Sequence, residues 1–269
     1  SALTNMKIAR ALNAKMLLRI EDIDTTRCTP ELETQMLKDL EWIGFEWDEQ
    51  PRRQSEHFDE YSSTLEQMNK QELLFPSVLS RGQIKSILKE KERTEENWLS
   101  DPDGAPLYPG DEHLNDDVSK TELINSGEPY ALRFDIAKSK VTTEQQWTEF
   151  DITQSNKKVF GDAAQWGKPV LGRKDTPASY HLCCVIDDAL QGVTHVVRGQ
   201  DLYHATSIHR LLQEILKLPE PLYHHHPLIL DETGKKLSKS DGDTSIAALR
   251  EQGLTKNQIL EDFHSKGLI

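Results

Sequence analysis

The stretch that decides the fold covers residues 227–240 and reads Pro227-Leu228-Ile229-Leu230-Asp231-Glu232-Thr233-Gly234-Lys235-Lys236-Leu237-Ser238-Lys239-Ser240. Its first four residues form a short apolar run, which predicts a buried strand. The strand leads into a loop that contains Lys235, Lys236 and Lys239. Ligands of open α/β sheets bind at the carboxyl ends of the strands, where mobile ammonium groups suit an anionic polyphosphate. The alternative is a solvated basic loop, which is the commoner meaning of a charge run.

The composition indicates a globular protein without a membrane segment. The 269 residues are 36% hydrophobic and 29% charged, and no apolar run approaches the roughly 20 residues of a membrane helix. The formal charge of −13 argues against indiscriminate nucleic acid binding, although a local basic groove stays open. Cys28, Cys183 and Cys184 are too few for a disulfide framework, which favours the cytoplasm. With no large exposed apolar stripe in the sequence, we expect a monomer.

The beginning of the chain predicts a helix followed by a strand. Apolar residues recur at helical spacing over residues 3–12, and residues 16–20 form an apolar run. The run ends in a carboxylate cluster that includes Glu21, Asp22 and Asp24. On composition alone, such a cluster recognises an ammonium group, caps a helix or solvates a turn, and a structural role is as well supported as binding.

Helix starts and apolar stripes continue this alternation. Thr29 precedes a helix with an inward stripe from Leu32 to Ile43, and Gly44 ends it. Ser55 is expected to open the next helix and Ser80 to cap a third. A strand over residues 73–75 lies between these two helices.

The pattern changes after residue 88. Residues 89–117 are rich in charge, proline and glycine with little periodicity, which indicates an insertion. Residues 130–136 and 147–152 alternate at period two, so each is expected to be a half-exposed, antiparallel strand. A strand over residues 194–201 and a helix over residues 208–216 then restore the α/β alternation. Thr244 and Thr255 are candidate N-caps of two short final helices.

Three motifs, which occur in the same order as in the family, resemble those of the class I aminoacyl-tRNA synthetases. Lys236-Leu237-Ser238-Lys239-Ser240 resembles their KMSKS loop, with leucine in place of methionine. Residues 18–27 resemble the RIEDxDxxR strand of the glutamyl branch. Tyr180-His181-Leu182 and residues 185–199 are similar to the YHLA-VVDDxLxGVTHVxRG block of that branch. An ordered set over most of the chain is far more specific than any one motif.

The resemblance implies a role for each matching residue. Glu21 would receive the α-ammonium group of glutamate, Tyr180 would line the glutamate pocket, and Arg198 would pair with a substrate carboxylate. Taken singly, these residues are better explained as a surface carboxylate, a core-edge tyrosine and a structural arginine. Their joint occurrence at the ends of elements favours binding.

The resemblance also implies ATP with Mg²⁺ as the second substrate. Lys236 and Lys239 would be catalytic and bind the ATP phosphates, with Lys239 neutralising the developing pyrophosphate. Ile229 would contact ATP. The glutamate carboxylate attacks the α-phosphorus, so no side-chain nucleophile is needed.

The fold implied by the resemblance and the alternating pattern is α/β. It is a Rossmann-type parallel sheet with an inserted α+β subdomain and short C-terminal helices. The expected parts are residues 1–75 for the first half of the catalytic domain, 76–165 for the insertion, 166–243 for the second half with the lysine loop, and 244–269 for the C-terminal helices.

Within the glutamyl branch, the chain resembles the short glutamyl-Q tRNA(Asp) synthetases. These enzymes activate L-glutamate and place it on the queuosine base in the anticodon of tRNA(Asp). Residues 172–175 resemble that subfamily, and the chain ends at Ile269 with no room for the helical anticodon-binding domain of an ordinary glutamyl-tRNA synthetase. Two alternatives stay open: the catalytic part of an ordinary enzyme that charges tRNA(Glu), and a non-catalytic tRNA-binding paralogue.

Two features depart from the family pattern. The HxGH motif would precede Ser1, so we expect the 269 residues alone to be catalytically incomplete. The zinc cysteines of many short members correspond to Ser77, Leu79 and Glu112, and because leucine cannot ligate zinc, we expect no zinc there. The run His224-His225-His226 is not expected to bind a metal either, because consecutive strand residues point to opposite faces.

Overall fold

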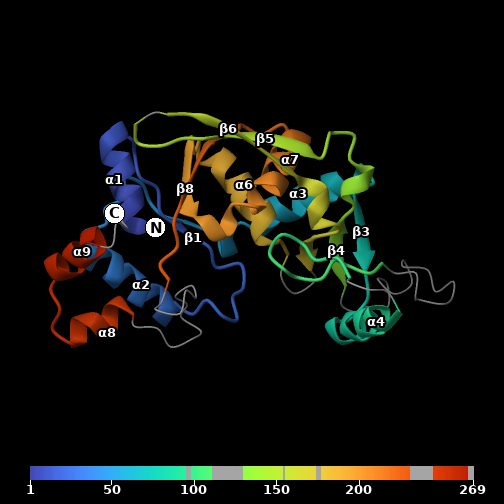
Figure 1. Ribbon diagram of the computed structural model, residues 1–269, viewed down its shortest axis with the longest axis horizontal. Helices are drawn as coiled ribbons and strands as arrows, with labels where there is room; N and C mark the ends of the chain where they lie inside the picture. The colour runs from blue at the N-terminus through green and yellow to red at the C-terminus, as the bar shows by residue number, and fades with distance from the viewer. Residues whose placement is uncertain (95–97, 111–129, 154, 174–176, 231–244, 266–269) are drawn as a thin grey trace.

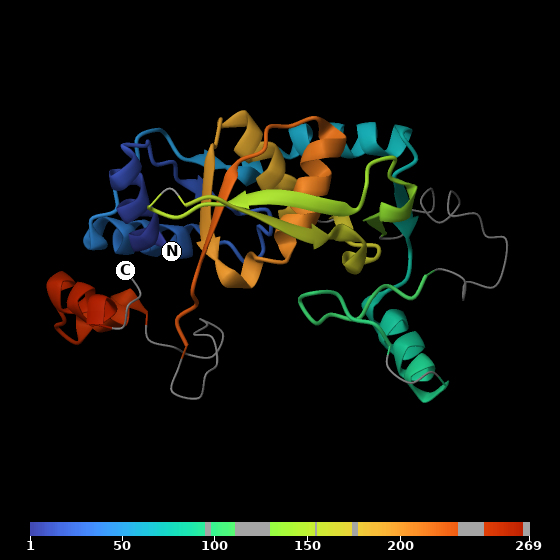
Figure 2. The same cartoon turned by 45° about the horizontal axis from the view of Figure 1, so that its top comes forward.

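The computed structural model describes residues 1–94, 98–110, 130–153, 155–173, 177–230 and 245–265. The helices α1, α2, α8 and α9 gather at one end of the molecule, together with the amino terminus (Figure 1). The helix α4 projects from the opposite end (Figures 1 and 2). Between the two ends, α6 and α7 pack beside the long strands β5 and β6. The described strands form three sheets, of two, three and four strands.

The first sheet has two parallel strands, of which the sequence predicted only the first. Strand β1 (Arg19–Ile20) pairs in parallel with β2 (Arg52–Arg53). Helix α1 (Ala2–Leu12) precedes β1, and α2 (Pro30–Ile43) connects the two strands. The apolar residues of α1 and α2 share a small core that includes Met6, Ile43 and Phe45.

The predicted ends of α2 are confirmed, but its apolar stripe is shorter than expected. The Thr29 hydroxyl accepts a hydrogen bond from the Leu32 amide at 3.4 Å, and Gly44 ends the helix with φ 78°. A left-handed backbone of this kind favours glycine because it has no Cβ. Leu32 is 61% exposed, so the prediction that it faces inward was wrong. It lies in the first turn, before the helix reaches the core.

Ser55 does not open a helix, contrary to the prediction. It lies in the 3₁₀ turn η1 (Gln54–Glu56), and helix α3 (Phe58–Lys70) begins later. The Ser55 amide and hydroxyl both donate to the Asp22 carboxylate, at 2.9 and 2.7 Å. Its polar groups therefore hold the loop after β1 rather than a helix terminus.

The second sheet is antiparallel and carries α4. Its strands are β3 (Leu74–Ser77), β4 (Ala131–Phe134) and β7 (Val170–Arg173), in that order. Ser80 caps α4 (Arg81–Thr94) as expected, because its hydroxyl accepts from the Gln83 amide while Gln83 bonds back to the Ser80 amide. The helix continues to Thr94, so the prediction of irregular structure from residue 89 was wrong at its start. Charged residues on an exposed helix break apolar periodicity without ending the helix.

The third sheet has the order β6-β5-β9-β8 and joins the two strands at the end of the expected insertion to two later strands. Strand β5 (Glu144–Glu149) is antiparallel to β6 (Lys157–Asp162) and parallel to β9 (Leu222–His226). Strand β8 (His195–Gly199) is parallel to β9. Strand β5, which was expected over residues 147–152, is thus hydrogen-bonded to β9, the strand that precedes the lysine loop. Helix α7 packs against β5, and the β5 residues Trp147 and Thr148 are buried rather than half-exposed.

The strand before the lysine loop lies five residues earlier than predicted. Strand β9 ends at His226, and the apolar run that follows is open to solvent, with Ile229 37% and Leu230 53% exposed. The partner strand explains the shift, because the pairing stops where Gly199 meets His226 and the chain after Gly199 turns into η4 (Gln200–Leu202). Residues 231–244, with the lysine loop, lie outside the described residues.

The main core is built around two helices. Helix α6 (Tyr180–Leu190) and helix α7 (Ala205–Leu216) contribute fully buried residues such as Leu182, Ile208 and Leu212. The remaining short elements are η2 (Ile136–Lys138), η3 (Ala163–Trp166), α8 (Ile246–Glu251) and α9 (Lys256–Ser265). Ser245 rather than Thr244 caps α8, while Thr255 accepts from the Gln258 amide as expected.

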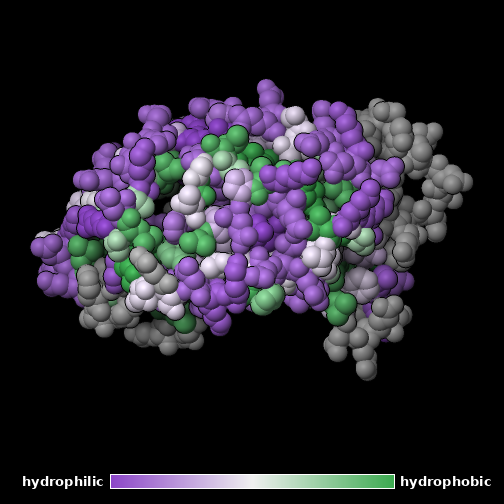
Figure 3. All heavy atoms as spheres, turned by 90° about the horizontal axis from the view of Figure 1, so that it is seen from above, coloured by the Kyte–Doolittle hydropathy of each residue, from purple (hydrophilic) through white to green (hydrophobic). Residues whose placement is uncertain are grey.

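The surface is predominantly polar. The face in Figure 3 is covered mainly by hydrophilic residues, with hydrophobic side chains in small groups between them. Among the described helices, none is both long and apolar enough to cross a membrane.

Candidate active site

A cavity of about 640 Å³ opens where β1, α6 and β8 come together. Four residues that the motifs predicted line it, from distant parts of the chain: Glu21, Tyr180, Arg198 and Ile229. Glu21 follows the end of β1, Tyr180 is the first residue of α6, and Arg198 is the fourth residue of β8. The predicted residues Lys236 and Lys239 lie outside the described residues.

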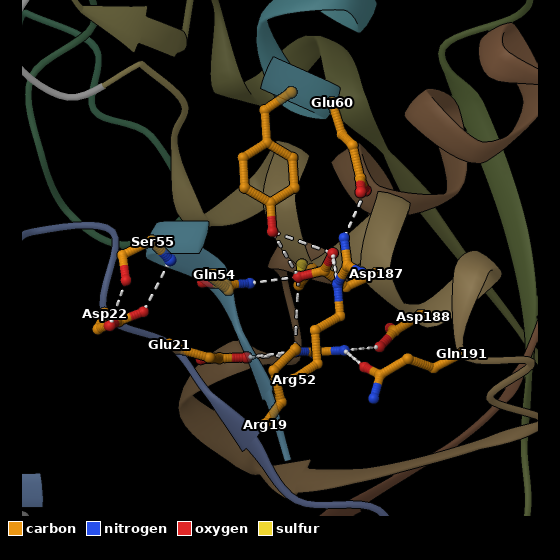
Figure 4. A network of polar contacts seen from close by, with 12 residues as sticks. Arg19, Glu21, Asp22, Arg52, Gln54, Ser55, Glu60, Asp187, Asp188 and Gln191 are labelled. Atoms are coloured by element: carbon orange, nitrogen blue, oxygen red, sulfur yellow. Dashed lines mark hydrogen bonds and ion pairs between the residues drawn. The ribbon is translucent and has the colours of Figure 1, made fainter. Parts of the chain in front are cut away.

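Glu21 stands beside an arginine that fixes its position. Its carboxylate accepts from the Arg19 guanidinium at 3.2 and 3.3 Å, and the side chain stays 39% exposed. Arg19 also donates to Asp188, at 2.7 Å, and to Gln191 (Figure 4). Burial opposes the charge of Arg19, but the carboxylates of Asp188 and Glu21 outweigh it and raise its pKa above the usual range. Arg19 therefore holds two carboxylates at one wall of the cavity.

Arg198 is held by three neutral side chains. Its Nε donates to His225 at 3.1 Å, its Nη1 lies 3.0 Å from His209, and its Nη2 donates to Thr206 at 2.8 Å. Its guanidinium carbon also lies 5.3 Å from the ring of Tyr223. Only 9% of Arg198 is exposed, so these contacts fix the guanidinium where β8 meets the cavity.

Tyr180 also lines the cavity. Its ring packs against His181 and His209, with centroids 5.9 Å apart in each case. Burial, together with Cys184 and Glu21, raises the pKa of the Tyr180 hydroxyl above its usual range, so the group remains a hydrogen-bond donor at neutral pH.

A buried carboxylate behind the cavity was not predicted from the sequence. Asp187 is fully buried on α6 and accepts from Arg52 and Gln54 at 2.8 Å each and from the Tyr61 hydroxyl at 2.9 Å (Figure 4). Arg19 completes the group at 4.0 Å. Asp187 thus joins β1, the β2 region and α3 to α6. The signal in the sequence was an acidic residue inside an otherwise apolar helical stretch, which requires a buried partner.

The two imidazoles on Arg198 were also missed as site residues. His225 belongs to the run His224-His225-His226, and its Nδ1 lies 2.7 Å from the Glu149 carboxylate. His224 instead contacts the Phe150 carbonyl, and His226 contacts Ser1 and the Pro227 carbonyl. The three rings therefore diverge, as expected for consecutive strand residues.

The region around Ser77, where we expect no zinc, contains a direct hydrogen bond between side chains. The Ser77 hydroxyl donates to the Tyr108 hydroxyl at 2.7 Å, and Arg133 stacks on the Tyr108 ring at 3.7 Å. Glu112 lies outside the described residues. Within the part of the chain that the structure describes, no three histidine, cysteine or acidic side chains are grouped as metal ligands.

Comparison with known proteins places the chain in one family. The model of the family "tRNA synthetases class I (E and Q), catalytic domain" matches residues 1–268. A glutamyl-Q tRNA(Asp) synthetase of Rhodobacter capsulatus is 36% identical over 94% of this chain and 88% of its own length. A glutamate–tRNA ligase of Aquifex aeolicus is 34% identical over 94% of this chain and 50% of its own length.

A solved structure supports the same assignment. The crystal structure of a glutamate tRNA ligase from Elizabethkingia meningosepticum, in complex with its amino acid, superposes with a TM-score of 0.68 at 29% identity. The match covers 90% of this chain and 48% of that one, so the chain spans about half the length of the ligases it matches. The mixed α/β architecture with parallel strand pairs is that of their catalytic domain. The chain belongs to the class I tRNA synthetases of the E and Q type, whose catalytic domain it matches along almost its whole length.

Proposed function

We propose that this protein activates L-glutamate with ATP and transfers the glutamyl group to the queuosine base in the anticodon of tRNA(Asp). The activation step is supported by one observation: Glu21, Tyr180 and Arg198 line the same cavity. A carboxylate and a guanidinium on the wall of one cavity complement the ammonium and carboxylate groups of an amino acid. The transfer step is supported by the 36% identity with the Rhodobacter capsulatus protein.

In the proposed reaction, a carboxylate oxygen of glutamate attacks the α-phosphorus of ATP. The bond from that phosphorus to pyrophosphate breaks, and glutamyl-adenylate forms. A hydroxyl of the queuosine ring then attacks the glutamyl carbonyl carbon, loses its proton, and displaces AMP. The protein orients the reactants: Glu21 and Arg198 hold glutamate, Ile229 contacts ATP, and Lys236 and Lys239 stabilise the charge on the phosphates with Mg²⁺.

The remaining parts of the proposal concern the protein as a whole. We propose a cytoplasmic monomer that needs no zinc, with Ser77 and Tyr108 joined directly in the insertion. The free thiols of Cys183 and Cys184 are buried in the core, which suits a reducing compartment. We also propose that the chain divides into the four parts named above, with boundaries after residues 75, 165 and 243. Because β5 and β6 join β8 and β9 in one sheet, the insertion as proposed shares that sheet with the second half of the catalytic domain.

The experiment that tests the proposal is glutamate-dependent exchange of pyrophosphate into ATP by the natural full-length protein, without tRNA. The resemblance implies that short enzymes activate glutamate unaided, so we expect exchange. Transfer is then measured with labelled glutamate on tRNA(Asp) that contains or lacks queuosine. Labelling that requires queuosine supports the proposal, and equal labelling of both tRNAs contradicts it.

A second candidate function is the charging of tRNA(Glu). The 34% identity with the Aquifex aeolicus glutamate–tRNA ligase favours it. Under this alternative, exchange is silent until tRNA(Glu) is added, and the label appears on tRNA(Glu) rather than on tRNA(Asp). Silence with every tRNA would point to a non-catalytic paralogue.

A further inference from the structure

The side chains that contact Arg198 directly carry no negative charge. Its neighbours His209, Thr206 and His225 are all buried or nearly so, and each faces a different nitrogen of the guanidinium. Among the described residues, no carboxylate lies within 4.0 Å of Arg198. Most buried arginines are instead paired with acids, because an unpaired charge is expensive to bury.

The contacts of His209 determine where its proton lies. Arginine only donates, so Nδ1 of His209, 3.0 Å from Nη1 of Arg198, must be the acceptor. The proton is then on Nε2, which lies 3.0 Å from Nδ1 of His181 and donates to it. Burial, and then the charge of Arg198, lowers the pKa of His209 well below 6.5 and that of His181 to about 4. His209 is therefore a neutral imidazole in one tautomer.

The same reasoning applies to His225 on the other side. Its Nε2 accepts from Nε of Arg198 at 3.1 Å, so its proton is on Nδ1, which donates to Glu149 at 2.7 Å. Glu149 also accepts from the Trp147 indole at 2.7 Å. The nearest carboxylate on this path is thus separated from Arg198 by a neutral ring.

Two N–H donors of Arg198 remain for a ligand. An arginine has five N–H donors, and the three contacts above engage one on Nε, one on Nη1 and one on Nη2. With respect to the described residues, one N–H on each terminal nitrogen is left. A pair of this kind is what a bidentate carboxylate contact requires.

We propose that His209 is a positioning residue for substrate selection, because it orients the guanidinium of Arg198 as a neutral acceptor and leaves its positive charge uncancelled for the side-chain carboxylate of the amino acid. This inference rests on the proposed function. It assigns a task to a residue of α7 that touches no substrate. A carboxylate at position 209 would hold Arg198 equally well but would neutralise it.

The test compares two variants that differ by one charge. In His209→Asn, the amide oxygen stands near the place of Nδ1, and in His209→Asp a carboxylate oxygen does so. Dissociation constants for L-glutamate, L-glutamine and ATP are measured by isothermal titration calorimetry on the full-length protein. We expect His209→Asp to bind glutamate at least about tenfold more weakly than His209→Asn, the scale of one charge-assisted hydrogen bond. The preference for glutamate over glutamine should fall in the same proportion, with ATP binding unchanged.

His195 provides the matched control. It lies on the same strand as Arg198, but its ring packs against Phe150, 4.9 Å away, and does not line the cavity. His195→Asn and His195→Asp should bind glutamate alike. If His209→Asp does not fold, as judged by its melting temperature, Thr206→Val replaces it. This variant removes one neutral acceptor at constant volume and should weaken glutamate binding without affecting ATP.

Each outcome is decisive. Equal glutamate binding by the Asn and Asp variants at position 209, or unchanged glutamate binding in Thr206→Val where that variant is used, overturns the inference and leaves the proposed function intact. A parallel loss of ATP and glutamate binding shows a merely structural role and also overturns it. Absence of glutamate binding by the unmodified protein overturns the proposed function itself, and with it this inference.

Discussion

Two buried arginine sites of this protein are built in opposite ways. Around Asp187, the arginines Arg19 and Arg52 are balanced by carboxylates (Figure 4). Around Arg198, the partners are two imidazoles and a hydroxyl. The first arrangement cancels charge and joins elements together. The second orients a guanidinium and preserves its charge, and it is the one that the motifs connect with substrate.

Stability and ligand binding make opposite demands on the surroundings of a buried arginine. A guanidinium with a carboxylate partner is stabilised in the native state, but its charge is no longer available to a ligand. A guanidinium among neutral acceptors keeps its charge at the expense of stability, which is common at functional sites.

Asp187→Ala should be the most damaging change. It leaves Arg52 and Arg19 without their buried carboxylate and removes the acceptor of Tyr61, so the free energy of unfolding should fall by about 3–5 kcal/mol. Urea denaturation followed by circular dichroism measures the change. Asp151→Ala is the control, because within the described residues Asp151 bonds to Thr153 and Ser155 of its own exposed loop, so this variant should change stability little. A similar loss in both variants would contradict the role of Asp187.

Arg198→Lys should separate binding from stability. Lysine keeps the charge but loses the planar fork, so the dissociation constant for glutamate should rise by about 10- to 100-fold, while ATP binding stays the same. Calorimetric titration of each ligand measures both values. Arg52→Lys is the matched control: it should lower the melting temperature and leave glutamate binding nearly unchanged. A reversal of the two phenotypes would show that the two sites have been assigned the wrong way round.

Local features of the fold were predictable because their physics is local. Thr29 before Pro30 and Gly44 after Ile43 mark the ends of α2 through groups only a few residues apart. Ser80 and Gln83 do the same for α4. The strand before the lysine loop was misplaced because its position depends on its partner, β8, and not on its own hydrophobicity. Pairing between distant segments sets the register of a strand.

The candidate site shows the same limit. The resemblance identified Glu21, Tyr180 and Arg198, and the structure brings all three to one cavity. The partners of Arg198 lie 11 and 27 residues further along the chain, on a helix and on another strand. No spacing rule connects them. His209 in the apolar helix α7 was the available signal, since a fully buried imidazole needs hydrogen-bond partners.

The neutral imidazoles predict a specific dependence of stability on pH. His181, which packs on Trp166, Tyr180 and His209, has a native pKa of about 4 against 6.5 when unfolded. Between these values the unfolded chain binds the extra proton, so stability falls as the pH falls. His181 alone should remove about 2 kcal/mol of the free energy of unfolding between pH 7.5 and pH 5. Urea denaturation at both pH values measures it.

The matched variant for this effect is His181→Asn, which keeps an acceptor for His209. Its stability should decline less than that of the unmodified protein over the same pH interval, by about the same 2 kcal/mol. Equal declines would mean that His181 is protonated in the native state. In that case the chain of neutral rings behind Arg198 would not exist as described.

The exposed ion pair of Lys15 and Glu49 completes the comparison with a third environment. The two groups lie 3.3 Å apart, but their side chains are 75% and 57% exposed. Water already screens both charges, so Glu49→Gln should change the free energy of unfolding by less than about 1 kcal/mol, and salt should reduce even that. Urea denaturation at low and high ionic strength provides the measurement. An effect as large as that of Asp187→Ala would mean that ion-pair geometry alone, rather than burial of the partner, decides what a charge contributes in this protein.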